Sequence, residues 1–452
     1  MRRLPGDLVP KEDLGIVLVD YKLRDGTVMP VTHETVVKVL ERVSAIDGVE
    51  KSCTVFGDGI FSPTGENTAK TYIALKPWAE RGRGASTGEI IAKMRAAVAD
   101  IAEAQIVFMT PATVPGIGTI NGISPLVLAV GHNDPVRLAD EAHRLRDLLK
   151  RSPIADTVTC GYNTDAPHLR IKVDREKCEL MKVPLSTLFS TLQHYLGSIY
   201  VNDVNLGIQV NRVTLMSDWK GRSTPETMAG LFVRSTTGAM VPVSALVEFA
   251  EEPGPNTIYR YNRYIYCTVD FGQKNGVSVS DAMKEVGGLV ERELPRDFAT
   301  GWVGLAYEES ANPGRMSLMI ALALLAAYLV LLVRCESWRR SFFTLLPSVA
   351  AVFGGALLLY LTGVSLSLDS RLALIMLVVL TTAFSLFEGG SDGWLARMRF
   401  PLLAALMALP LVFTSGVGAA GARSLGMTLV GGYLGYALLS GTLGVRRSEK
   451  EG

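Results

Sequence analysis

The side chains most often used in catalysis and metal binding are scattered along this sequence. The histidines have neither metal-site nor triad spacing, and no two of the five cysteines form a CxxC pair. The histidines are His33, His132, His143, His168 and His194. We therefore expect no enzymatic activity, no cofactor and no metal site.

A glycine-rich segment at 56–65, with the sequence FGDGIFSPTG, is the best candidate for binding chemistry. Glycine lets a loop adopt unusual backbone conformations, and apolar and aromatic side chains make contacts that tolerate many ligands. The residues singled out are Gly57, Gly59, Ile60, Phe61 and Gly65. Residue chemistry alone favours an ordinary turn with core phenylalanines, and a binding loop for apolar ligands is the alternative.

The charge of the chain is nearly balanced, with 45 Lys and Arg residues against 44 Asp and Glu residues. This balance does not support nucleic-acid binding, which usually needs a basic surplus on one face. Most of the charge lies in residues 1–315, whereas Leu, Ala, Val, Gly and Met dominate residues 316–445. The sequence therefore predicts a soluble region followed by a membrane region.

Five apolar stretches follow one another in the second region, at 316–333, 342–363, 368–387, 401–415 and 424–444. Most approach the length of about 20 residues that a bilayer requires, and the fourth is short. A buried helix bundle is disfavoured, because so many apolar segments leave little polar surface for water. We expect five transmembrane helices.

Basic residues are distributed unequally between the loops that join these stretches. The loops on one side, with the C-terminal tail, hold Arg334, Arg339, Arg340, Arg397, Arg399, Arg446, Arg447 and Lys450. The other side holds only Arg371 and Arg423. Since cytoplasmic loops are enriched in Lys and Arg, we expect residues 1–315 outside the cytoplasm and the C-terminus inside.

The N-terminus does not contain the apolar core of a signal peptide. Met1 is followed by Arg2, Arg3, Leu4 and Pro5. Export of so long a region with no preceding membrane segment is improbable. We therefore expect at least one further transmembrane helix upstream.

The soluble region reads as a repeated α+β unit. Residues 15–109 predict the order β-α-β-β-α-β, and the order recurs between 124 and 303. An insertion at 167–255 interrupts the second copy, and a strand at 257–271 follows it. That strand contains Tyr259, Tyr261, Tyr264 and Tyr266. Such an aromatic run is more typical of strand packing than of a site.

Several short motifs occur in the order and spacing of one half of a known transporter type. They are Leu4–Gly15 (LPGDLVPKEDLG), Ala74–Arg81 (ALKPWAER), Tyr200–Asp203 (YVND), Gly238–Ser244 (GAMVPVS), Glu336–Trp338 (ESW) and Gly431-Gly432. Together they resemble the C-terminal half of the resistance-nodulation-division (RND) multidrug efflux transporters. The likeness is to the AcrB/acriflavine-resistance type, in the hydrophobe/amphiphile branch, and it covers nearly the whole chain.

The resemblance implies an α+β periplasmic porter region followed by an all-α bundle of five transmembrane helices, helices 8 to 12 of the family. Two ferredoxin-like porter subdomains are implied, at 1–112 and at 113–166 with 256–310. An inserted docking subdomain is implied at 167–255, and the membrane helices at 316–445.

The resemblance also implies a function and partners. Such pumps are homotrimers of the bacterial inner membrane that join a periplasmic adaptor and an outer-membrane channel. They use inward proton flow to export lipophilic small molecules. The chain is expected to need an N-terminal half from another chain. A degenerate or non-transporting structural or regulatory subunit is the alternative. The protein-export accessory or lipid-transporter branch is a third interpretation, and the docking insertion argues against the accessory.

Site residues follow from the same resemblance. The segment at 56–65 resembles the family's switch loop between the proximal and distal drug pockets, which turns the preference towards a binding loop. Phe108 resembles the end of a pocket-lining strand. The docking and trimer contacts are implied at Tyr200, Val201, Asn202 and Asp203.

The resemblance fails along the proton path. Ionisable groups inside a membrane are costly and usually functional. Thr381 and Thr382 match the run that precedes a family lysine, and Glu388 occupies the lysine position. These three residues are the candidate relay. A loop position for Glu388 is favoured over a rewired relay, so the relay is expected to be absent or damaged.

Overall fold

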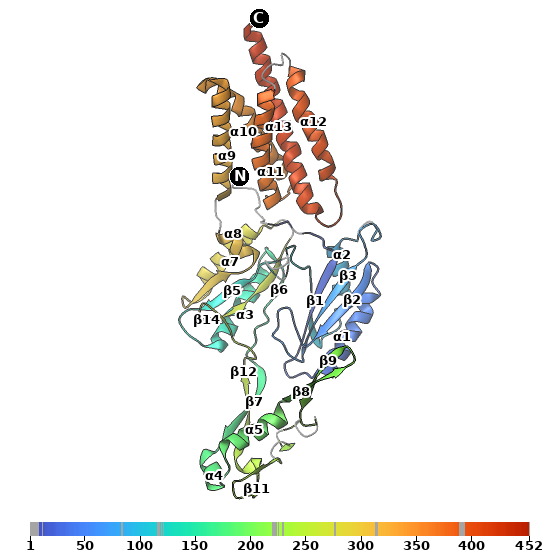
Figure 1. Ribbon diagram of the computed structural model, residues 1–452, viewed down its shortest axis with the longest axis vertical. Helices are drawn as coiled ribbons and strands as arrows, with labels where there is room; N and C mark the ends of the chain where they lie inside the picture. The colour runs from blue at the N-terminus through green and yellow to red at the C-terminus, as the bar shows by residue number, and fades with distance from the viewer. Residues whose placement is uncertain are drawn as a thin grey trace. The chain divides into compact units, whose positions relative to one another are not determined.

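The structure is a computed structural model. It describes residues 9–10, 12–82, 85–114, 118, 120, 122–218, 224, 226–227, 230–274, 277–311, 315–387 and 394–451. The chain divides into two compact units: the stretch Asp165–Gly254, and the residues on either side of it. Each unit is described by itself below, and Figure 1 labels the elements.

The first half of the larger unit is a four-stranded antiparallel sheet with two helices. Its elements are β1 (Ile16–Leu23), α1 (Met29–Ser44), β2 (Val49–Phe56), β3 (Thr68–Leu75), α2 (Thr87–Ala97) and β4 (Ala104–Met109). The strand order is β2-β3-β1-β4. Because strand side chains alternate between faces, Val17, Val19 and Tyr21 enter the core and Asp20 lies on the opposite face of β1.

The second half has its own strands and helices around a separate core. Its elements are β5 (Pro125–Ala129), α3 (Pro135–Arg151), β6 (Ala155–Thr159), β13 (Tyr259–Tyr261), β14 (Tyr264–Thr268), β15 (Asp270–Gln273), α7 (Val279–Glu293), β16 (Phe298–Trp302) and α8 (Leu305–Ala311). One sheet has the order β13-β14-β5-β16, and β15 pairs with β6. The continuous strand predicted at 257–271 is wrong, because Asn262 and Arg263 adopt φ values of 47° and 74° and turn the chain.

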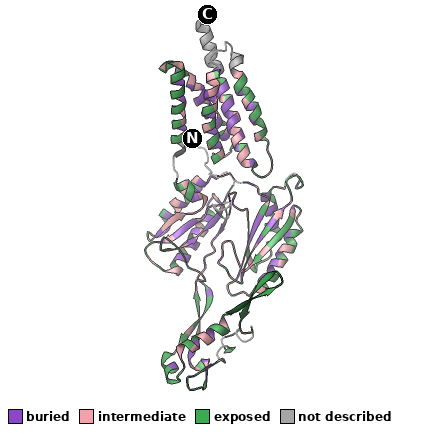
Figure 2. Ribbon diagram, in the orientation of Figure 1, coloured by how far each residue is buried: buried purple, intermediate pink, exposed green. Residues whose placement is uncertain are grey.

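The smaller unit contains three two-stranded sheets. Its elements are β7 (Ala166–Val173), α4 (Arg175–Leu180), α5 (Leu185–Leu196), β8 (Ile199–Leu206), β9 (Gln209–Leu215), β10 (Phe232–Arg234), β11 (Met240–Pro242), a 3-10 turn at Val243–Ala245 and β12 (Val247–Gly254). Leu188, Leu192, Val243 and Leu246 lie in its core. The β8–β9 hairpin, in contrast, is exposed along nearly its whole length (Figure 2).

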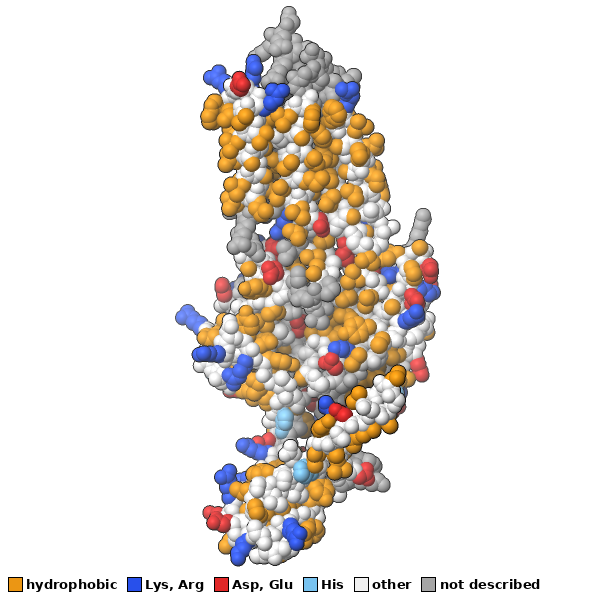
Figure 3. Space-filling model, viewed as in Figure 1, with side chains coloured by type: hydrophobic (Ala, Val, Ile, Leu, Met, Phe, Trp, Pro, Cys, Tyr) orange, Lys and Arg blue, Asp and Glu red, His pale blue; other side chains and the backbone are white. Residues whose placement is uncertain are grey.

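Five helices follow the second half: α9 (Arg315–Cys335), α10 (Trp338–Thr362), α11 (Leu368–Phe387), α12 (Trp394–Val412) and α13 (Ala419–Glu451). Within the described residues, α9, α10 and α11 are long and apolar enough to cross a membrane, and α12 contributes a shorter apolar stretch at Met398–Val412. Figure 3 shows many hydrophobic side chains on the face that these helices present in this view. Spans at α12 and α13 stay a prediction.

Polar contacts join α11 and α13 to earlier parts of the chain. The Glu12 carboxylate accepts hydrogen bonds from the backbone N–H groups of Ala420 and Gly421, at 3.2 and 2.8 Å. These groups belong to the first turn of α13, where N–H groups have no partner within the helix. Arg371 of α11 lies 3.5 Å from the carboxylate of Glu309 in α8.

Glycines allow α10 and α13 to pack backbone against backbone. A Cβ atom added to Gly354 would lie 2.4 Å from the carbonyl oxygen of Gly431, and one added to Gly435 would lie 2.7 Å from that of Ala350. Gly431 and Gly435 are four residues apart, so they occupy one face of α13. Small residues at this spacing are typical of close helix pairs in membranes.

We expect Gly431→Val to destabilise this helix pair, because its Cβ would lie 2.7 Å from the oxygen of Gly354. A cost on the order of 2–3 kcal/mol is typical of overpacking. Thermal unfolding of the purified chain in detergent measures the change. Leu438→Val is the control, since Leu438 is exposed on the same helix. Equal unfolding temperatures for the two variants would contradict this packing.

Candidate functional site

The glycine-rich segment forms a closed loop between β2 and β3. The N–H of Gly65 donates to the carbonyl oxygen of Gly57 at 3.1 Å, and the N–H of Gly57 donates to that of Thr68 at 2.9 Å. Gly57 has φ +80°, in the left-handed region that favours glycine. The loop therefore starts and ends at one point and presents Ile60 and Phe61 at its tip.

A buried carboxylate holds this tip. Asp20 of β1 is 4% exposed, and its Oδ1 accepts a hydrogen bond from the N–H of Ile60 at 2.6 Å. The N–H of Phe61 also donates to it. Burial raises the pKa of Asp20, and these two hydrogen bonds oppose the rise. A Cβ on Gly59 would lie 3.3 Å from the same carboxylate oxygen, so glycine leaves room for the contact.

The same loop touches the second half of the unit through another glycine. A Cβ atom on Gly161 would lie only 2.1 Å from the carbonyl oxygen of Phe61. The ammonium group of Lys22 donates to the carbonyl oxygen of Gly161 at 3.1 Å. Asn163 donates to the carboxylate of Asp25 at 2.5 Å. Residues 161–163, which follow β6, thus contact the loop, β1 and the chain just after β1.

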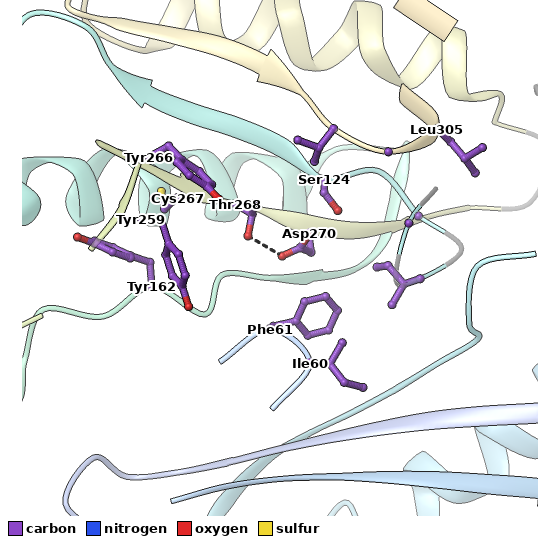
Figure 4. A pocket seen from close by; sticks show the side chains of 15 residues that line it. Ile60, Phe61, Ser124, Tyr162, Tyr259, Tyr266, Cys267, Thr268, Asp270 and Leu305 are labelled. Atoms are coloured by element: carbon purple, nitrogen blue, oxygen red, sulfur yellow. Dashed lines mark hydrogen bonds between the residues drawn. The ribbon is translucent and has the colours of Figure 1, made fainter. Parts of the chain in front are cut away.

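A cavity of about 370 Å³ lies where these parts meet. Its lining comes from the loop, from the segments before β5, after β6 and after β16, and from β13, β14 and β15, and Figure 4 shows the side chains. The lining includes Ile60, Phe61, Tyr162, Tyr259, Tyr266 and Asp270. A space of this size suits a small organic ligand.

Aromatic rings form much of the cavity wall. The rings of Tyr259 and Tyr266 have centroids 5.9 Å apart and are tilted by 44°. Tyr162 is 6% exposed, and its hydroxyl has no hydrogen-bond partner in the described part of the chain. Burial raises the pKa of Tyr162 to about 12, so its phenol stays protonated at neutral pH.

Asp270 gives the cavity a buried carboxyl group. It is 6% exposed, and its Oδ2 accepts a hydrogen bond from the Thr268 hydroxyl at 3.0 Å. Burial raises the pKa of Asp270 to about 6; a hydrogen bond with Ser124 opposes this rise, and the charge of Asp20 adds to it. No described Lys, Arg or His forms an ion pair with Asp270.

A thiol pair lies at the cavity, with Cys267 in its lining. Cys160 and Cys267 are hydrogen-bonded, and His143 also bonds to Cys160. The bond from Cys267 and the neighbouring histidine lower the pKa of Cys160, whereas the pKa of Cys267 is raised. Among the residues that the structure describes, no three His, Cys, Asp or Glu side chains could hold a metal ion.

The predicted site residues separate into groups. Ile60 and Phe61 line the cavity, while Gly57, Gly59 and Gly65 shape the loop. Phe108 is 1% exposed in the core of the first half, and the cavity lining does not include it. Its role as a pocket residue stays a prediction.

Sequence reasoning missed both carboxylates and gave the tyrosines a packing role. A charged residue inside a strand that is otherwise apolar was the available signal, in IVLVDYKL for Asp20 and in CTVDF for Asp270. The alternating run that includes Tyr259 and Tyr266 was the signal for the aromatic wall. Neither signal reveals that Asp20 holds the loop whose tip lines the cavity, or that Asp270 lines the same cavity.

The candidate relay residues lie apart from this cavity. Thr381 and Thr382 are buried in α11, and their hydroxyls donate to the carbonyl oxygens of Leu377 and Val378, at 2.5 and 2.6 Å. Glu388 lies outside the described residues. Nearby, the hydroxyls of Ser385 and Tyr436 are 2.9 Å apart.

The candidate docking residues lie on β8 of the smaller unit. All of them, Tyr200, Val201, Asn202 and Asp203, are exposed. The guanidinium of Arg212 on β9 stacks 5.4 Å from the centroid of the Tyr200 ring. Ile208, at the hairpin turn, is fully exposed. The hairpin therefore presents apolar side chains that are unusual on a free surface.

Comparison with known proteins identifies relatives of the whole chain. Residues 1–386 match the family model described as the AcrB/AcrD/AcrF family. The multidrug resistance protein MdtF of Escherichia coli K12 is 29% identical over 97% of this chain and 44% of its own length. The toluene efflux pump membrane transporter TtgB of Pseudomonas putida is 24% identical over the same shares. These matches confirm the resemblance to RND transporters.

A solved structure supports the fold. The crystal structure of a heavy metal efflux pump superposes with a TM-score of 0.85 over 98% of this chain and 48% of that chain, at 20% identity. The multidrug export protein AcrF of Escherichia coli is 26% identical over 97% of this chain and 45% of its own length. The chain thus spans about half the length of the relatives it matches.

We expect Gly161→Ala to displace the loop at 57–65, since the new Cβ would lie 2.1 Å from the Phe61 oxygen. Amide hydrogens of the loop should exchange on the order of tenfold faster, measured by mass spectrometry. Gly272→Ala is the matched control, because nothing lies within 4 Å of a Cβ there. Unchanged exchange in Gly161→Ala would exclude the close contact.

Stability should depend on the ionisation of Asp270. Its pKa rises from 3.8 to about 6 on folding, so the folded chain binds more protons between those values and unfolding becomes easier as pH rises through them. The loss is about 3 kcal/mol for roughly two pKa units. We expect Asp270→Asn to remove this part of the pH dependence of thermal unfolding. A pH profile identical to the wild type would overturn the assignment.

Proposed function

Because this chain belongs to the AcrB/AcrD/AcrF family of efflux transporters, which are not enzymes, we propose that it supplies the C-terminal half of a proton-driven pump that exports hydrophobic or amphiphilic compounds. The observation that carries this proposal is the aromatic cavity closed by the Ile60–Phe61 loop. The relatives named above are efflux transporters, and their coverage is consistent with a half-length chain.

The proposed domains follow the repeated units. Residues 1–112, and 113–166 with 256–310, act as two porter subdomains of ferredoxin-like type. The strand order β2-β3-β1-β4 with two helices supports this assignment for the first. The docking subdomain is proposed at 167–255, and the five membrane helices at 316–445.

We propose that the helices lie in the bacterial inner membrane, with residues 1–315 periplasmic and the C-terminus cytoplasmic. The three long apolar helices support insertion. The basic residues at the end of α9 and the start of α10, Arg334, Arg339 and Arg340, support the orientation, because cytoplasmic ends and loops are enriched in Arg and Lys.

The loop at 57–65 is proposed to act as the switch loop of a drug pocket. Phe61 supplies a ring that contacts many apolar ligands with little regard to their shape. Asp20 holds the closed position through the backbone and leaves the Phe61 side chain at the cavity. Loss of these hydrogen bonds would free the tip to move between two positions.

The β8–β9 hairpin is proposed to join neighbouring subunits of a homotrimer and to face the outer-membrane channel, with a periplasmic adaptor as a further partner. Its exposed apolar residues, including Val201, Leu206 and Ile208, support a protein contact. An N-terminal half is proposed as another partner. The candidate relay would comprise Thr381, Thr382 and Glu388, and protons would be the coupling ion.

Drug susceptibility in a pump-deleted Gram-negative host tests this function. We expect resistance when the chain is expressed with an N-terminal half, none when it is expressed alone, and loss of resistance with a proton uncoupler. Phe61→Ala should lower the inhibitory concentration roughly fourfold, as expected for the loss of about 1 kcal/mol of aromatic contact.

Tyr72→Ala is the control, because Tyr72 is exposed on β3 and does not line the cavity. Resistance in this variant should equal that of the wild type. The absence of resistance with both halves detected in the membrane would favour the alternative, a degenerate or non-transporting structural or regulatory subunit.

A further inference from the structure

The cavity keeps a carboxyl group at a position where its charge is costly. Asp270 is 6% exposed, and among the described residues its carboxyl group has the hydroxyl groups of Thr268 and Ser124 as hydrogen-bond partners. An ionised carboxylate in such a place normally has a cationic partner, because burial removes its hydration. Within the described ranges, no basic side chain pairs with it.

The charged groups around Asp270 do not supply that partner. Asp20 of β1 and Cys160 after β6 face it, and both are acidic groups that disfavour its ionisation. Two lysines on β1 and β3 have other contacts. Lys22 donates to the carbonyl oxygen of Gly161, and Lys70 bonds to Asp58 at 2.5 Å. Neither of these contacts involves Asp270.

Aromatic rings line the cavity together with this carboxylate. Phe61 enters from the loop, and Tyr259 and Tyr266 come from the β13–β14 hairpin (Figure 4). The faces of aromatic rings carry partial negative charge and attract cations, more strongly when water is excluded. A buried carboxylate beside several rings is the combination that recognises organic ammonium ions.

We propose that this cavity selects lipophilic organic cations over neutral compounds of the same shape, with Asp270 as the counter-ion and the rings of Phe61, Tyr259 and Tyr266 as the cation-binding wall. The inference rests on the proposed function, since it names the class of compound that the same pocket takes.

The Asp270 carboxylate also gives a physical reason for the preference for cations over neutral compounds. A cation replaces part of the hydration that Asp270 loses on burial, whereas a neutral ligand of equal size leaves the charge unpaired. An anionic compound would face the like charge of Asp270 in the cavity lining and be excluded. The aromatic rings contact the apolar part of a ligand, and this contact contributes to the binding of charged and neutral ligands alike.

Binding to the purified full chain in detergent tests this proposal. The probes are a naphthylalkyl trimethylammonium ion and its neutral tert-butyl isostere, which differ in charge and hardly in shape. Equilibrium dialysis gives both affinities. We expect the wild type to bind the cation on the order of tenfold more tightly, and Asp270→Asn to remove this preference while keeping its affinity for the isostere.

Asp156→Asn is the matched control, because Asp156 is an exposed carboxylate on β6 that pairs with Arg95 outside the cavity. It should keep the tenfold preference. Tyr259→Leu provides a second test that leaves Asp270 intact, since Tyr259 is 37% exposed in the β13–β14 hairpin. It should weaken cation binding severalfold, and Tyr259→Phe should restore it.

The pH dependence adds an independent readout. Binding of the cation should weaken as pH falls through about 6, where Asp270 becomes protonated, and binding of the isostere should not change. Asp20 and Cys160 are the other acidic groups that face Asp270. The same pH profile in Asp270→Asn would assign the titration to one of them and overturn the role of Asp270.

The outcomes separate this inference from the function it rests on. Equal binding of the two probes by the wild type, with both weakened by Phe61→Ala, would refute cation selection and leave the drug pocket intact. Binding of neither probe, or binding that Phe61→Ala does not alter, would refute the pocket itself. A preference that survives in Asp270→Asn would also refute the proposal.

Discussion

The hydrogen bonds from the backbone of Ile60 and Phe61 to the carboxylate of Asp20 are the contact on which the cavity depends. They replace the hydration that Asp20 loses in the sheet, and they fix the tip of the loop. Gly161 then lets the second half approach the Phe61 backbone more closely than any side chain would permit. One buried charge and one missing Cβ therefore set the geometry of the cavity.

Buried carboxylates in two halves of the unit act in different ways. Asp20 is satisfied by backbone donors and has a positioning role. Within the described residues Asp270 has two hydroxyl donors, and burial raises its pKa. Because a structural carboxylate could be replaced by a neutral side chain at a gain in stability, Asp270 is better explained by what enters the cavity than by the fold.

The membrane helices use a different principle. Apolar side chains on their outer surface, such as Leu357 and Leu438, do not discriminate between helix neighbours, since lipid is equally apolar. Specific pairing of α10 with α13 comes from Gly354, Gly431 and Gly435, where backbones meet. Glu12 then ties the first turn of α13 to the chain before β1.

The sequence by itself determined the family, the mixed α+β and apolar-helix composition, and the loop at 57–65, because motifs, hydrophobic periodicity and glycines are local properties. Only the tertiary structure decided which residues share the cavity. Asp20 and Asp270 are far apart in the sequence, and each looks like an isolated polar residue in an apolar strand. Asp20 holds the loop whose tip lines the cavity and Asp270 lines the cavity itself, and the close approach at Gly161 that brings the two parts together is recorded by no local pattern.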